Sequence, residues 1–220
     1  MGKDENHVFW VLQERKKHPT FANGFAGAQT TFPPPCRKDL QDMVTIQSHT
    51  LKQRENMKST IVIYGSSTGA CQAIAGTIAS KLGVEAVDVT SIDNSTIAQH
   101  DNLILGTSTW GAGEMQDDWY DGVKVLKEAG LGGKTVALFG CGDSGSYSDT
   151  FCGGLKEIYD AALEAGANVV GSVPTDGYTF DDSEAVVDGK FVGLALDDVN
   201  EEDQTEPRID AWLEAIKPAL

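Results

Sequence analysis

The sequence predicts an α/β fold: a doubly wound, five-stranded parallel sheet with helices on both faces. From residue 57 onward, short runs of β-branched and aliphatic residues alternate with segments of helical length. Such alternation is typical of a parallel sheet that is covered on both sides. A loop rich in hydroxyls and glycine directly follows the first of these runs. The chain has 220 residues, enough for one good core.

The elements are predicted from the spacing of apolar residues. The expected strands are 61–64, 84–89, 102–106, 134–140 and 167–173. The expected helices are 70–82, 117–129, 150–165 and a terminal helix that includes 209–216. Ligands of such sheets bind outside the carboxyl ends of the strands. The loops after the first, third and fourth strands are therefore expected to share one rim.

Residues 1–56 differ in character from the rest of the chain. They hold 8 Lys and Arg against 6 Asp and Glu, a net charge of +2, whereas residues 57–220 hold 9 against 27, a net charge of −18. The first segment has no sustained hydrophobic period. We therefore expect an N-terminal extension, 1–56, that is disordered or not native, and a ligand-binding domain over 57–220.

The overall charge and the cysteines narrow the functional classes. A net charge of −16 argues against nucleic acid and anionic membranes as partners. The four cysteines form no C-x-x-C pair, and no apolar run is long enough for a membrane span. We expect a cytoplasmic protein without a metal site, since three of the four histidines precede residue 57.

The loop Gly65 to Cys71 has the features of an anion site. Three hydroxyls, Ser66 to Thr68, stand before the expected helix, whose N-terminus has free N–H groups and a partial positive charge. A nucleophile elbow centred on Ser67 would need a later histidine, and only His100 follows. A P-loop would need a lysine that the loop lacks. The pattern favours a phosphate that is held by hydroxyls and backbone, although a plain helix cap is an alternative.

Two further rim loops each contain one aromatic residue among small residues. Trp110 lies in the loop expected at 107–118, and Tyr147 lies in the loop 141–149. Such aromatic residues can cover a flat ligand, or they can simply cap the core. The match of 140–145 to G-x-G-x-x-G follows the fourth strand rather than the first, and we treat it as chance.

These loops together resemble those of flavodoxins, the FMN-binding one-electron carriers. The resemblance covers residues 59–220 and rests on 66–71, 108–111 and 142–147. Residues 175–197 resemble the insertion that splits the fifth strand of long-chain flavodoxins. The resemblance to flavodoxins implies the flavodoxin-like strand order 2-1-3-4-5, FMN as cofactor, and electron transfer rather than enzymatic catalysis. Cys71 stands where the family usually has threonine.

The resemblance also implies roles for individual residues. The phosphate would be wrapped by Ser66, Ser67, Thr68, Gly69, Ala70 and Cys71, and the ribityl chain lined by Thr107, Ser108 and Thr109. The ring would be stacked by Trp110 and Tyr147, with Gly111, Cys141, Gly142, Asp143 and Asp149 near its edges. The Gly111–Ala112 peptide would turn over beside the flavin N5, which glycine permits.

The resemblance further implies the partners. A flavin-dependent NADP reductase, or another redox protein with a basic docking face, would suit a monomeric acidic carrier. One alternative is an FMN-dependent quinone reductase of the same fold. Another is a binding module without flavin or a response-regulator domain. A response regulator would need an acidic pair after the first strand, and residues 65–71 contain none.

Overall fold

The computed structural model describes residues 59–220. The predicted extension, 1–56, lies outside the described residues. The central sheet contains the parallel strands β2, β1, β3 and β5 in this order, with β6 and β10 both paired to the outer edge of β5. Their bounds are β1 Thr60–Gly65, β2 Glu85–Asp88, β3 Asn102–Trp110, β5 Thr135–Cys141, β6 Asn168–Val170 and β10 Leu194–Leu196. This is the predicted order, 2-1-3-4-5.

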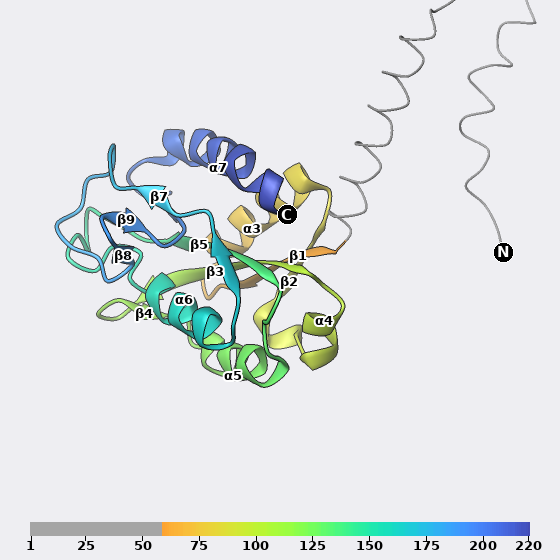
Figure 1. Ribbon diagram of the computed structural model, residues 1–220. Helices are drawn as coiled ribbons and strands as arrows, with labels where there is room; N and C mark the ends of the chain where they lie inside the picture. Colours follow the sequence, from red (N-terminus) through yellow and green to blue (C-terminus); the bar gives the residue numbers. More distant parts are fainter. Residues whose placement is uncertain (1–58) are drawn as a thin grey trace, which may run out of the picture. The chain divides into compact units, whose positions relative to one another are not determined.

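Helices cover both faces of this sheet (Figure 1). Alternate residues of β1 point to opposite sides, so that Ile61 and Ile63 join one apolar cluster and Val62 and Tyr64 the other. Buried side chains of α4, α5 and α6 complete the first cluster, and those of α3 and α7 the second. The helices span α3 Ala70–Leu82, α4 Asn94–Ala98, α5 Trp119–Ala129, α6 Leu155–Glu164 and α7 Glu202–Ile216, with short 3-10 turns at Val89–Ser91 and Lys217–Ala219.

The fifth strand is split, as the resemblance implied. β6 pairs with Thr135 to Ala137 of β5, and β10 continues along the same edge at Phe139 to Cys141. Between them, the inserted segment forms a separate antiparallel sheet of β7 Val173–Pro174, β9 Lys190–Phe191 and β8 Val186–Val187.

Aromatic rings join this insertion to the rest of the domain. Phe151 lies 5.9 Å from both Phe180 and Phe191, measured between ring centroids. The Tyr178 hydroxyl donates to the carbonyl of Ala195 in β10. The insertion therefore packs directly against the segment that precedes α6.

Several element boundaries differ from the sequence prediction, most of all the end of β3 and the start of α6, and one helix was not predicted. β3 extends to Trp110, because residues 107–108 pair with β5 and residues 109–110 pair with the short strand β4, Glu114–Met115. The helix predicted from residue 150 begins at Leu155, after a series of turns. The short helix α4 was not predicted; its cap is Asp93, whose side chain accepts the backbone N–H of Thr96.

Candidate functional site

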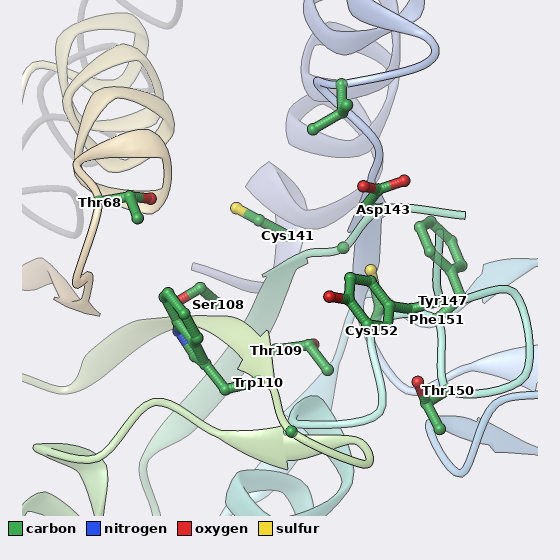
Figure 2. A pocket seen from close by; sticks show the side chains of 13 residues that line it. Thr68, Ser108, Thr109, Trp110, Cys141, Asp143, Tyr147, Thr150, Phe151 and Cys152 are labelled. Carbon is green, nitrogen blue, oxygen red and sulfur yellow. The ribbon is translucent and has the colours of Figure 1, made fainter. Parts of the chain in front are cut away.

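A cavity of about 400 Å³ opens at the carboxyl edge of the sheet, beside β3 and β5. This is the size range of small-molecule sites and the expected place for one in this architecture. It is lined by Thr68, Ser108, Thr109, Trp110, Gly111, Cys141, Gly142, Asp143, Tyr147, Thr150, Phe151, Cys152 and Val199. Figure 2 shows Thr68, in the loop that leads into α3, on one side and the segment bearing Tyr147 on the other.

The loop between β1 and α3 presents donors at one end of this cavity. Ser67 and Thr68 are exposed, and Gly69 has a left-handed φ of +93°, which lets the chain turn into the helix. The Gly69 N–H donates to Ser66 Oγ at 3.1 Å. No side chain caps α3 and its first turn has no acidic residue. The N–H groups of this turn therefore remain available to an anion.

Cys71 contributes to this loop through its backbone only. Its side chain is fully buried in the cluster beneath α3. A hydrogen bond with the Cys141 thiol, followed by burial, raises the pKa of the Cys71 thiol well above its ordinary value. The thiol stays protonated and faces the core.

Two aromatic residues border the cavity from different loops. Trp110 is 44% exposed and Tyr147 is 58% exposed, unusual fractions for large apolar side chains. In Figure 2 they stand on opposite sides of Thr109. The Trp110 Nε1 donates to Ser108 Oγ at 2.9 Å, which holds the indole ring. The two rings are placed to cover a flat ligand on either side.

Thr109 supplies an independent indication of a ligand. Its hydroxyl oxygen is buried and has no hydrogen-bond partner among residues 59–220. A buried hydroxyl without a partner costs free energy unless something else satisfies it. Because Thr109 also lines the cavity, a bound molecule with polar groups would supply that partner.

A network of hydrogen bonds holds the loop that carries Tyr147. The Asn200 Nδ2 donates to Asp143 Oδ1 at 2.9 Å, and the Ser146 N–H donates to the same oxygen at 2.9 Å. These bonds, that of Asn200 foremost, lower the pKa of Asp143. The carboxylate is therefore ionised at neutral pH and fixes the turn before Tyr147.

The structure brings most of the predicted site residues together. Nine of them line the cavity: Thr68, Ser108, Thr109, Trp110, Gly111, Cys141, Gly142, Asp143 and Tyr147. Ser66, Ser67, Gly69 and Ala70 form the adjoining loop and the first residue of α3. Thr107 is fully buried and bonded to Gln116, so its side chain is directed away from the cavity. Asp149 is exposed and does not line the cavity.

Sequence reasoning missed four lining residues. Thr150, Phe151 and Cys152 were assigned to a helix that begins only at Leu155. Cys152 has a φ of +54°, a conformation that apolar periodicity cannot reveal. Val199 is 71% exposed in a run of acidic residues, and only its isolated apolar character distinguished it.

Other kinds of site are not evident in the described part of the chain. Among residues 59–220 there is no group of three or more His, Cys, Asp or Glu that could hold a metal ion. No helix of these residues has the length and apolar character needed to cross a membrane. No lysine or arginine among residues 59–220 lines the cavity.

The fold and cavity define a class: a doubly wound α/β protein with a cavity at the carboxyl edge of its sheet. This cavity is suited to a flat ligand between aromatic rings, with an anionic group at a helix N-terminus. Comparison with known proteins makes this specific. The sequence profile described as flavodoxin matches residues 62–212. The chain belongs to the flavodoxin family.

Individual relatives agree with this assignment. Flavodoxin 1 of Azotobacter vinelandii is 42% identical over 163 residues, which cover 71% of this chain and 94% of that protein. The flavodoxin of Helicobacter pylori is 41% identical over 157 residues, with coverage of 71% and 94%. The structure of Fusobacterium nucleatum flavodoxin bound to flavin mononucleotide superposes with a TM-score of 0.68 at 34% identity, covering 73% of this chain and 98% of that one.

Proposed function

We propose that this protein is an FMN-binding, low-potential one-electron carrier that passes electrons between redox proteins. The observation that carries the proposal is the cavity itself. An uncapped helix N-terminus with exposed hydroxyls and two exposed aromatic rings lie around one space of about 400 Å³. The buried Thr109 hydroxyl, which has no partner among the described residues, fits a polyhydroxylated chain between the ring and the phosphate.

FMN, when bound, would supply the redox chemistry, and the protein would bind and orient it. The α3 turn and the hydroxyls of Ser67 and Thr68 would hold the phosphate without a cation. Trp110 and Tyr147 would cover the ring and exclude water from its faces. Because none of the described residues that line the cavity is basic, added negative charge on the ring would be disfavoured.

The test is reconstitution of the apoprotein. FMN should bind tightly and turn the protein yellow, riboflavin should bind more weakly because it lacks the phosphate, and FAD should be hindered by its second nucleotide. Reductive titration should separate two one-electron steps. An apoprotein that takes up none of these flavins would refute the proposal.

We propose redox partners with basic docking faces, such as a flavin-dependent NADP reductase, and a monomeric carrier in the reducing cytoplasm. The support is the charge of −18 over residues 57–220 and, among residues 59–220, the free thiols of Cys71, Cys141 and Cys152. Electron transfer to such a reductase should slow as salt rises, because the Debye length falls from ~10 Å at 0.1 M to ~3 Å at 1 M. An electron-transfer rate that does not change with salt concentration would show that charge steering does not contribute.

We also propose that residues 57–220 form the complete functional domain. The proposal rests on the lack of hydrophobic periodicity in 1–56. Deletion of residues 1–56 should leave flavin affinity and melting temperature unchanged. A melting temperature lower by many degrees would contradict it.

A further inference from the structure

Gln116 is a buried polar residue that touches the anion loop but belongs to a different segment. It follows β4 directly and is only 3% exposed. It packs against Gly65, the last residue of β1. A Cβ atom at Gly65 would lie 2.5 Å from Gln116 Oε1 and 2.5 Å from the Trp119 ring. The absence of a side chain at Gly65 therefore makes room for Gln116 beneath the loop.

Hydrogen bonds fix the orientation of the Gln116 amide. Its Oε1 accepts the backbone N–H of Asp118 at 3.1 Å. Because the oxygen is held there, the NH₂ group faces the other way, and it donates to Asp118 Oδ2 at 2.8 Å and to Ser67 Oγ at 3.3 Å. The Gln116 backbone N–H donates to Thr107 Oγ1 at 3.1 Å, which anchors the residue to β3.

This arrangement determines what the Ser67 hydroxyl can offer a ligand. A hydroxyl has one proton to donate and lone pairs that accept. Since Gln116 donates to the Ser67 oxygen, that oxygen acts as the acceptor and the Ser67 proton stays free. An anion can only accept hydrogen bonds, so it gains from a hydroxyl that donates and is repelled by one that presents lone pairs.

We propose that Gln116 is a positioning residue of the anion site, which holds the Ser67 hydroxyl with its proton directed toward a bound phosphate monoester. The inference rests on the proposed function, because it takes the phosphate of FMN as the anion. It goes beyond that function by assigning a role to a residue outside the loop. It also links the phosphate end of the site to β3, which carries Thr109 and Trp110.

The phosphate group allows this role to be separated from general support of the fold. FMN and riboflavin share the ring and ribityl chain, and only FMN has the phosphate. Gln116→Met should weaken FMN binding to the apoprotein about ten-fold, as expected for one hydrogen bond to a charged group, and change riboflavin binding by less than about two-fold. Gln116→Glu should weaken FMN binding more, about 100-fold, because Ser67 would then donate to the new carboxylate.

A double-mutant cycle tests whether Gln116 acts through Ser67. Ser67→Ala alone should also weaken FMN binding about ten-fold, and adding Gln116→Met should cost little more. Gln204→Met provides the matched control: Gln204 lies on α7, does not line the cavity, and donates to a neighbouring carboxylate, that of Asp203. That variant should bind both flavins like the wild type. Gln116→Glu, with nearly the same size, serves if the methionine variant does not fold.

The outcomes are distinguishable. Equal losses for FMN and riboflavin would give Gln116 a merely structural role and overturn the inference. So would additive losses in the cycle, or FMN affinity that is unchanged in both Gln116 variants. A wild-type apoprotein that binds neither flavin would instead refute the proposed function itself, and the inference with it.

Discussion

The Asp197 carboxylate accepts two hydrogen bonds from Ser144: one from the backbone N–H at 3.0 Å and one from the hydroxyl at 2.5 Å. Asp197 follows β10 and is 1% exposed, whereas Ser144 belongs to the loop after β5. Asn200 donates to the same carboxylate through its backbone N–H and its side chain. Burial alone would raise the pKa of Asp197, but these hydrogen bonds outweigh it and lower the pKa.

Asp197→Ala should therefore loosen the loop that carries Tyr147. The backbone N–H of Ser144 and the amide of Asn200 would lose their acceptor, at a cost of about 1–3 kcal/mol in the free energy of unfolding. FMN affinity should fall as well, since Val199 and Tyr147 border the cavity on the two segments that Asp197 joins. Urea unfolding and flavin titration measure the two effects. Asp198→Ala, at the neighbouring position, is the control, and equal effects from both variants would contradict the argument.

The aromatic walls of the cavity give a second prediction. Trp110→Ala and Tyr147→Ala should each weaken FMN binding by ~1–3 kcal/mol, through lost stacking and lost apolar cover. Tyr120 is a matched control, because it is 46% exposed but lies on α5 and does not line the cavity. Titration of the apoprotein compares the three variants. If the two cavity variants bind like Tyr120→Ala, the ring lies elsewhere.

The two halves of this site differ in how far the sequence could predict them. The helix 70–82 was predicted to the residue, because Ile74, Ile78 and Leu82 repeat at helical spacing. In the structure, Gly69 and Gly83 flank this helix with left-handed φ angles. The anion loop could also be predicted, because its residues are neighbours in the sequence. Its support by Gln116 could not be predicted, because the Gln116–Ser67 bond joins residues 49 positions apart.

The part of the cavity lining that contains Phe151 and Cys152 was likewise not predicted from the sequence. The following helix was predicted from residue 150, although the apolar residues that repeat at helical spacing begin only at Leu155, where the helix starts. The carbonyl of Phe151 accepts a hydrogen bond from Ser183, a residue of the insertion 32 positions away. This partner is tertiary and leaves no signal in the local sequence.

The capping residue of α4 gives a prediction about pH. Asp93 accepts the backbone N–H of Thr96 at 2.7 Å and the hydroxyls of Thr96 and Ser95 at 2.8 Å each. These bonds, the Thr96 N–H foremost, lower its pKa from 3.8 to about 2. A pKa that is lower in the folded state means that the carboxylate stabilises the fold above pH 3.8 and loses this effect as the pH falls toward 2.

Asp93→Ala should accordingly be less stable than the wild type at pH 7, with a difference that shrinks steadily between pH 4 and pH 2. Urea unfolding at several pH values measures this difference. Asp88→Ala gives a comparison, since Asp88 also accepts an N–H, from Thr90, at the 3-10 turn. A difference for Asp93→Ala that stays constant down to pH 2 would contradict the cap as its source.

We expect Gly111 to influence the separation of the two one-electron potentials of bound FMN. Gly111 has a φ of +53°, and the next N–H, that of Ala112, donates to Glu114 Oε2 at 2.5 Å. A Cβ atom at Gly111 would collide with the same carboxylate oxygen. The Gly111–Ala112 peptide is therefore held in one orientation by Glu114, and turning it over toward the cavity would break that bond.

If this peptide turns between redox states, as the family resemblance implies, the free energy of the turn enters the first one-electron potential. Gly111→Val should hinder the backbone change and bring the two midpoint potentials of bound FMN closer together. Glu114→Ala should not hinder the backbone change, because it releases the Ala112 N–H and adds no Cβ atom at Gly111. Gly132→Val is the control, since a Cβ atom there meets nothing within 4 Å. Potentiometric titration measures the separation, and a Gly111→Val protein with the wild-type value would show that this peptide does not tune the flavin.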